Sequence, residues 1–133
     1  MKLENEKDTL TVSSSYLRNS VFEHSDLSGL KMNDVNLTGM EIIDANLSDI
    51  VIDGAQIGGA YLKNIGMPPE GHPLYDDCKN IIQRPVRFEN CDFNHSKITN
   101  CNLANVEINE CNIAGMKING ILIEDLLKRY NSK

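Results

Sequence analysis

Apolar residues recur at every fifth position through most of this chain of 133 residues. Between Leu17 and Met67 every fifth residue is Leu, Phe, Met or Ile, and a second run with the same step extends from Phe88 to Ile123. A step of five fits no continuous helix, because about 100° per residue would spread these centres around the whole cylinder. It fits no continuous strand either, since strand side chains alternate with period two. The chain must therefore alternate short extended pieces with turns.

The residues two positions after each centre form a second repeating set. All but Glu110 are Gly, Asn, Asp or His, the types that best tolerate left-handed backbone and turn corners. The set comprises Asn19, His24, Gly29, Asp34, Gly39, Asp44, Asp49, Gly54, Gly59, Asn64, Asn90, His95, Asn100, Asn105, Glu110, Gly115, Gly120 and Asp125. The sequence therefore predicts one corner in every five residues.

Several of these units resemble the Ala-(Asp/Asn)-Leu-x-x unit of the pentapeptide-repeat proteins. They include SDLSG at residues 25–29, VNLTG at 35–39, ANLSD at 45–49 and CNLAN at 101–105. The resemblance extends from about Leu10 to Asp125, apart from a central interruption. It implies a bacterial protein with an all-β fold, a right-handed quadrilateral β-helix in which four repeats make one square coil, here about five coils.

Residues twenty apart would then lie one above the other, about 4.8 Å apart, and the centres would form the core. Each coil would contact only its neighbours. The predicted core residues are Leu17, Phe22, Leu27, Met32, Leu37, Ile42, Leu47, Ile52, Ile57, Leu62, Phe88, Phe93, Ile98, Leu103, Ile108, Ile113, Ile118 and Ile123.

The chain length predicts a single domain, residues 1–133. Its C-terminal end changes period, because apolar and charged residues interleave there as in a short amphipathic helix. Such a helix is either a lid over the last coil or a dimerisation surface. The predicted segments are a mobile N-terminus at 1–8, first coils at 9–69, a protruding loop at 70–85, further coils at 86–123 and a helical cap at 124–133.

The net charge of −6 excludes a nucleic-acid-binding protein, because its basic residues are few and scattered. No apolar stretch reaches the roughly 20 residues of a membrane span. Residues 1–7 lack the apolar stretch of a signal peptide. A cytoplasmic location is therefore expected.

Three cysteines occupy inward small positions, two residues before a centre: Cys91, Cys101 and Cys111. Elsewhere the repeat places Ala, Ser or Val there, so we expect these cysteines to fill the core as small hydrophobes. Cys78 lies in the interruption, and it is the thiol we expect to be reactive if any is.

The two runs of repeats are separated by a step of 21 residues, so the five-residue phase slips. The interruption begins with three prolines within seven residues, which cannot supply every hydrogen bond of a strand ladder. Residues 70–85 are therefore predicted to leave the coil as a loop, with Ile81 and Ile82 packing back on the body. Loops of this length in compact proteins are usually functional.

The loop contains the candidate interaction residues His72, Tyr75, Asp76 and Asp77. A metal site formed with Cys78 is the alternative, but the spacing matches no zinc or calcium pattern. The chain also has no phosphate-binding loop and no nucleophile elbow. We therefore expect no enzyme, no catalytic residue, no metal and no cofactor.

A protein-binding module with an unidentified partner is the first functional hypothesis, as a monomer or as a homodimer through the C-terminal end. The partner would contact the loop at 70–85 and one outer wall. Val21, Ile43 and Tyr61 fall on one predicted face and form a candidate wall patch.

The family resemblance implies an alternative, since some bacterial members protect DNA gyrase and topoisomerase IV from quinolones by imitating duplex DNA. Duplex DNA carries one negative charge per about 1.7 Å, so a coil rising about 4.8 Å would need nearly three. Residues 37–56 carry four carboxylates and no cation, whereas residues 86–105 carry two of each sign. The predicted acidic surface is therefore patchy. A purely structural spacer is a further alternative.

Overall fold

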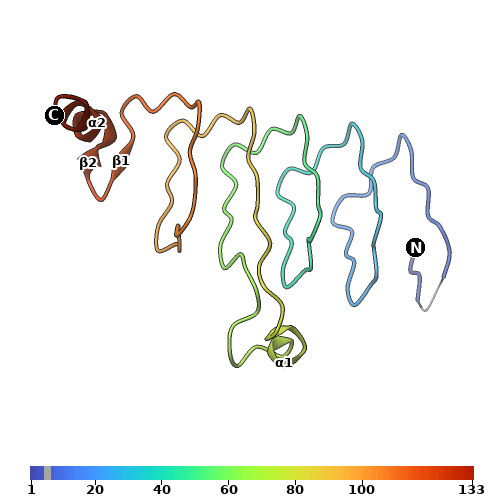
Figure 1. The fold of residues 1–133 in the computed structure, drawn as a ribbon. Helices are drawn as coiled ribbons and strands as arrows, with labels where there is room; N and C mark the ends of the chain where they lie inside the picture. The colour runs from blue at the N-terminus through green and yellow to red at the C-terminus, as the bar shows by residue number, and fades with distance from the viewer. Residues whose placement is uncertain (5–6) are drawn as a thin grey trace. The chain divides into compact units, whose positions relative to one another are not determined.

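A computed structural model describes residues 1–4 and 7–133, in two compact units, Met1–Ala60 and Tyr61–Lys133. Within each unit the backbone winds through coils in which extended pieces alternate with corners (Figure 1). The regular elements in the described residues are α1 (Tyr75–Cys78), β1 (Lys117–Ile118), β2 (Ile121–Leu122) and α2 (Ile123–Asn131). The repeats therefore consist mainly of extended pieces and turns outside regular strands.

The corners are left-handed at the predicted positions. From Asn19 to Gly120 every predicted corner residue has a φ between 49° and 79°. Ser14, with a φ of 49°, extends the series one step toward the N-terminus. Asp125 is the exception, because it lies within α2. The prediction of one corner per five residues is thus confirmed along both runs of repeats.

The corners are of two kinds, which alternate along the chain. In the first kind the centre's carbonyl accepts a hydrogen bond from the amide three residues later, as Leu27 does from Leu30 at 3.0 Å. A positive φ at the third of these four residues is the requirement of a type II turn. The intervening corners are bends. The centres that accept this bond are Leu27, Leu37, Leu47, Ile57, Phe93, Leu103 and Ile113.

An aspartate or asparagine directly before the centre braces six of these seven turns. Its side-chain oxygen accepts a hydrogen bond of 2.8–3.0 Å from the amide that follows the centre. The bracing residues are Asp26, Asn36, Asn46, Asp92, Asn102 and Asn112. Such Asx turns fold the backbone locally. No bend centre is preceded by Asp or Asn, so the sequence carries a ten-residue period that the five-residue pattern conceals.

A hydroxyl or thiol bridges five of the bends. Each is the side chain of the residue after the corner, and it donates to the carbonyl of the residue before the corner. The donors are Ser15, Ser25, Cys91, Cys101 and Cys111, with donor–acceptor distances of 2.8–3.3 Å. The three cysteines are exposed, which differs from the expected core filling, and they act at these corners as serine does.

Contacts around Phe88 agree with the predicted facing of the repeat. The rings of Phe88 and Phe93, two successive centres, meet edge to face with centroids 5.3 Å apart. Arg87 and Glu89, which flank Phe88, form an ion pair of 3.8 Å. The residues that flank two other centres pair as well. Around Leu17 the Arg18 guanidinium lies 5.6 Å from the Tyr16 ring centroid, and around Leu62 the Lys63 Nζ lies 5.4 Å from the Tyr61 ring centroid. The centres Phe88 and Phe93 therefore face one another, and the residues that flank Leu17, Leu62 and Phe88 pair with each other.

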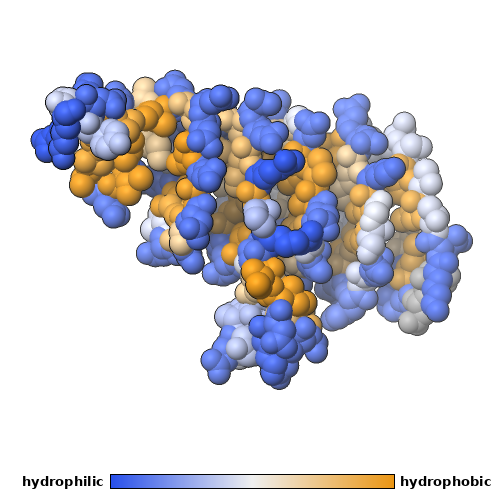
Figure 2. Space-filling model, viewed as in Figure 1, coloured by the Kyte–Doolittle hydropathy of each residue, from blue (hydrophilic) through white to orange (hydrophobic). Residues whose placement is uncertain are grey.

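The predicted core is not buried in this structure. No described hydrophobic residue is buried, and Figure 2 shows apolar side chains open to solvent between hydrophilic ones. Burial of a centre needs the next coil about 4.8 Å away, joined by a hydrogen-bond ladder. The backbone hydrogen bonds of the described residues close turns, helices and one hairpin instead, and strand occupies only β1 and β2.

Sixteen of the eighteen predicted core residues are 41–72% exposed, and two are half-buried. The exposed ones are Leu17, Phe22, Leu27, Met32, Leu37, Ile42, Leu47, Ile52, Ile57, Leu62, Phe88, Phe93, Ile98, Leu103, Ile108 and Ile118. The half-buried ones are Ile113 and Ile123.

A β-hairpin ends the repeats. β1 pairs antiparallel with β2, and Asn119 and Gly120 between them have φ angles of 49° and 79°. Two positive φ values in a two-residue loop define a type I′ turn, for which Asn-Gly is the preferred pair. The five-residue pattern misses this hairpin, although the dipeptide is a local signal for it.

The helix α2 is attached to the last turn of the repeats. The Glu124 carboxylate accepts a hydrogen bond of 2.6 Å from the Gly115 amide, and the Ile123 amide donates to the Met116 carbonyl at 3.1 Å. The helix runs from Ile123 to Asn131, within one residue of the predicted start at 124. The C-terminal segment therefore folds as a helix tied to the repeat beside it.

Replacing Asn46 by Ala should lower the free energy of unfolding by about 0.5–1.5 kcal/mol, because the Ser48 amide loses its side-chain acceptor. Asn46→Asp, which keeps an acceptor oxygen, should cost less. In the control Glu41→Ala, the replaced residue directly precedes a bend centre instead of a turn centre. Its free energy of unfolding should stay within about 0.5 kcal/mol of the parent value. Chemical denaturation of the three variants checks this, and equal losses for Asn46→Ala and Glu41→Ala would contradict it.

Candidate interaction surfaces

The segment 70–85, called the excursion below, is closed by its own hydrogen bonds. The His72 amide donates to the Pro69 carbonyl at 3.0 Å, and the Tyr75 amide to the His72 carbonyl at 2.9 Å. After α1, the Ile81 amide donates to the Cys78 carbonyl at 2.9 Å. Figure 1 shows α1 standing off the coils of its unit, at the tip of the excursion. The excursion is therefore a compact local structure.

Four residues predicted to interact with a partner come together around α1. The Nδ1 atom of His72 accepts a hydrogen bond of 3.1 Å from the Leu74 amide, so this imidazole braces the entry to α1. His72 and Tyr75 are half-buried, whereas Asp76 and Asp77 are exposed in the first turn of the helix. The excursion thus presents two adjacent carboxylates to solvent.

Lys79 contributes a cation to this surface, with its Nζ atom 3.8 Å from a carboxylate oxygen of Asp76. Ile81 and Ile82 are 57% and 85% exposed, so the expectation that they pack back on the body is wrong. The chain is extended after α1, and neighbouring residues of an extended chain point to opposite sides. Both side chains therefore cannot contact the same surface.

The three wall-patch residues are strongly exposed: Val21 at 72%, Ile43 at 74% and Tyr61 at 81%. Val21 and Ile43 belong to the first unit, and Tyr61 is the first residue of the second. Lys63 covers the Tyr61 ring on one side, with its Nζ 5.4 Å from the centroid. Each side chain is thus available to a partner within its own unit.

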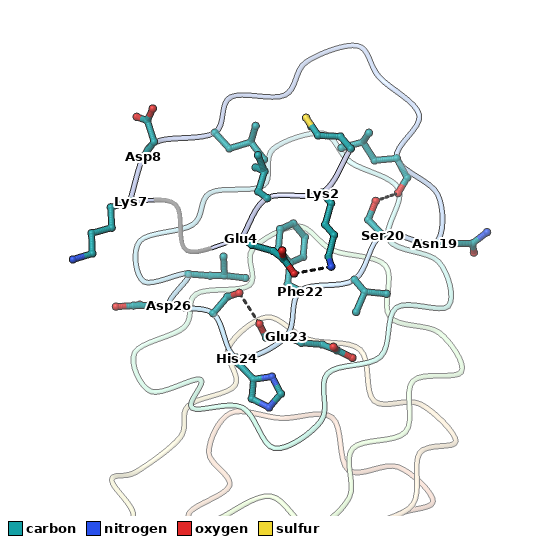
Figure 3. A pocket seen from close by; sticks show the side chains of 17 residues that line it. Lys2, Glu4, Lys7, Asp8, Asn19, Ser20, Phe22, Glu23, His24 and Asp26 are labelled. Carbon is teal, nitrogen blue, oxygen red and sulfur yellow. Dashed lines mark hydrogen bonds and ion pairs between the residues drawn. The ribbon is translucent and has the colours of Figure 1, made fainter.

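The interior of the first coil is a hollow of about 1140 Å³ that the sequence did not predict (Figure 3). The centres Leu17, Phe22 and Leu27 line it, together with residues 1–4. Lys2 and Glu4 form an ion pair of 2.6 Å at the hollow. Its volume exceeds the roughly 300–1,000 Å³ of ordinary ligand pockets, and it is the open inside of a coil.

In the described part of the N-terminal segment, residues 1–4 lie along this first coil. The mobility of residues 1–8 stays a prediction. Lys7 and Asp8 also line the hollow, although their side chains point away from it in Figure 3. Asn5 and Glu6 of the predicted mobile segment lie outside the described residues.

The pKa of Asp26 departs clearly from its ordinary value. The hydroxyl and the backbone amide of Ser28 both donate hydrogen bonds to its carboxylate, and they lower its pKa. This hydrogen bonding is the corner brace described above. The ionised carboxylate thus serves the turn, and its perturbation does not mark a reactive site.

No group of three or more His, Cys, Asp or Glu side chains that could hold a metal occurs among residues 1–4 and 7–133. Cys78, Cys91, Cys101 and Cys111 are free thiols. Within the same residues, no helix has the length and apolar character needed to cross a membrane.

A family model for pentapeptide repeats matches the chain in eight copies, over residues 12–39 and 87–124. Comparison with curated proteins found no match, and neither did comparison with solved structures. The two matched segments lie on either side of the excursion, and both contain the alternating turns and bends of the coils. The chain is a pentapeptide-repeat protein.

Proposed function

We propose that this protein is a non-enzymatic scaffold of the bacterial cytoplasm that binds a protein partner through the excursion. Pentapeptide-repeat proteins are generally repeat scaffolds without enzymatic activity, which supports the first half of the proposal. The second half rests on one observation. The excursion is the part of the chain that leaves the repeat, and it has its own hydrogen bonds and an exposed polar and apolar surface.

The scaffold that we propose is a single domain, a right-handed quadrilateral β-helix whose coils stack into contact. The left-handed corners, the meeting of Phe88 with Phe93 and the pairing of Arg87 with Glu89 support it. Stacking would remove the apolar centres from water, at about 1.5–3 kcal/mol for each large side chain. That gain is the reason to expect closure of coils whose backbone already has the required corners.

Two single substitutions test the stacking. Leu47→Asp places a carboxylate at a centre, and Val51→Asp places one beside a centre, at a position 85% exposed. In a closed β-helix Leu47→Asp should lower the free energy of unfolding by about 3 kcal/mol or more, because it buries an unpaired charge. Val51→Asp should change it by at most about 0.5 kcal/mol. Denaturant unfolding measures both values, and similar effects of the two variants would contradict stacking.

The chemistry of the excursion favours a partner with a mixed surface. Asp76 and Asp77 offer adjacent carboxylates, and Ile82 offers an exposed apolar side chain a few residues away. Apolar anchors beside polar groups are typical of protein interfaces. Functional residues also concentrate on loops that a rigid scaffold positions. The wall patch of Val21, Ile43 and Tyr61 is a second contact that we propose for the same partner.

Deletion of residues 70–85 should remove the main partner from a pull-down made with the full chain as bait. The double variant Asp76→Asn, Asp77→Asn should weaken its recovery if the carboxylates contribute. The triple variant Val21→Ser, Ile43→Ser, Tyr61→Ser tests the wall patch separately. Recovery of an unchanged set of proteins by the deletion variant would argue against the excursion, and capture of none by the parent would favour a structural spacer.

Exposed apolar side chains on α2 and the hairpin support a homodimer through the C-terminal end as the alternative to a monomer. Ile118 and Ile121 are 51% and 53% exposed, and Leu126 and Leu127 are 47% and 45% exposed. Figure 2 shows apolar side chains gathered at the C-terminal end of the chain. Acidic residues begin α2 and basic residues end it, so two antiparallel copies would have complementary charges.

A DNA-mimicking modulator of gyrase or topoisomerase IV is the second function that we propose to test. Its support is the acidic sequence of residues 37–56, which contains Glu41, Asp44, Asp49 and Asp53 and no Lys or Arg. On this hypothesis micromolar protein should change the supercoiling activity of purified gyrase, or restore it in the presence of a quinolone. Replacement of the four carboxylates by amides (Glu41→Gln, Asp44→Asn, Asp49→Asn and Asp53→Asn) is the matched control and should abolish the effect. Absence of any effect would remove this alternative.

A further inference from the structure

The corners on either side of the excursion are both bends, and one centre stands between them. The last corner before it, Asn64 after the centre Leu62, is a bend with a φ of 55°. The first corner after it, Asn90 after the centre Phe88, is again a bend, with a φ of 54°. One centre, Met67, stands between these bends at the place of the intervening turn. An uninterrupted chain would have a turn at this place, whereas residues 68 and 69 form no turn here, because proline cannot take the positive φ of the corner position. The bends on either side therefore keep the order that the alternation requires, and the excursion replaces the turn between them.

The length of the excursion explains why the five-residue and ten-residue periods both continue after it. Met67 and Phe88 are 21 positions apart, and subtracting five for one repeat leaves sixteen, the length of residues 70–85. Pro69 stands at the corner position after Met67, and Val86 stands two residues before Phe88, where an inward partner belongs. Joining Pro69 to Val86 would therefore restore a step of five between the two centres.

Directly after the excursion, side chains again lie on the two sides of the chain that the repeat predicts. Arg87 and Glu89 pair on one side of Phe88, and the Phe88 ring meets that of Phe93 on the other. Before the excursion, Tyr61 and Lys63 pair in the same way around Leu62. The excursion itself is held by hydrogen bonds between residues 69 and 81, including those of α1 and the one to the His72 ring.

We infer that residues 70–85 are an in-register insertion at one corner of an otherwise continuous repeat. The insertion is a self-folded element that the coils carry without change to their five-residue or ten-residue period. It can therefore vary in length and sequence while the scaffold stays the same. This inference concerns the register of the coils, and it holds whether or not the excursion binds a partner.

Four deletions test the register, with thermal unfolding followed by far-UV circular dichroism. Deletion of 70–85 is made together with Pro69→Gly, because proline cannot take the positive φ of the corner position, and the same substitution accompanies the deletion of 71–85. The 70–85 deletion then keeps both periods, and its Tm should lie within about 3 °C of the full chain. Deletion of 71–85 leaves one extra residue and turns the following centres outward, so its Tm should fall by about 5 °C or more, or its cooperative transition should disappear.

Two larger deletions separate the ten-residue period from the five-residue one. Deletion of 65–85 keeps the step of five but joins two bend repeats directly, Leu62 to Phe88. Deletion of 60–85 removes five residues more and restores a turn repeat before a bend repeat, Ile57 to Phe88. The longer deletion should therefore unfold at the higher temperature of the two, although it removes more of the chain.

A loss of Tm on deletion of 70–85 as large as that on deletion of 71–85 would overturn the inference. So would an equal Tm for all four deletions, or absence of a cooperative transition in every variant, because register would then not govern stability. The pull-down proposed above reads partner binding alone. An unchanged set of partners would reject the binding function of the excursion and leave the register result as it stands.

Discussion

A side-chain oxygen that accepts a hydrogen bond from the backbone just beyond the centre braces six of the seven type II turns of these coils. In Asn36, for example, the oxygen holds the Thr38 amide at 3.0 Å and the Thr38 hydroxyl at 2.6 Å. The turn then reverses the chain through a left-handed residue, which Gly39 adopts without steric cost. These bonds span two residues, so a corner folds before any distant part of the chain is in place. The coil is thus built from local contacts, and the stacking proposed above would add to a shape already present.

The coils can act as a scaffold and the excursion as an exposed surface because each is held by its own short-range hydrogen bonds. A repeat whose corners are set by short-range bonds tolerates a long interruption, provided that the interruption begins and ends at a corner. The excursion meets this condition, and its own hydrogen bonds keep it compact. Its exposed residues, such as Asp77 and Ile82, take no part in the coil. A surface of this kind can be adapted to a partner while the coils remain unchanged.

Much of the local fold could be predicted from the sequence. The five-residue step located the corners from Asn19 to Gly120, and the change of period located the start of the C-terminal helix to within one residue. The alternation of turn and bend was missed, because its signal is an Asp or Asn before six of the seven turn centres, with a period of ten residues, whereas the apolar pattern repeats at every fifth residue. The hairpin was missed because Ile118 and Gly120 also fit the five-residue repeat. The Asn-Gly pair favours a two-residue hairpin loop over a further repeat. Of the candidate site, the sequence predicted a loop at 70–85 but not the orientation of Ile82.

By itself the sequence determined the conformation at each corner, because glycine, asparagine and aspartate reach left-handed dihedrals that other residues avoid, and because their partners are two or three residues away. The sequence did not determine burial, because a centre such as Leu47 loses contact with water only when another coil lies against it. Only the tertiary structure decided that these centres stay exposed here, that Asp76 and Asp77 share one short helix, and that Glu124 ties α2 to Gly115. Each of those outcomes depends on contacts between parts of the chain or on the path of the backbone, which no local pattern encodes.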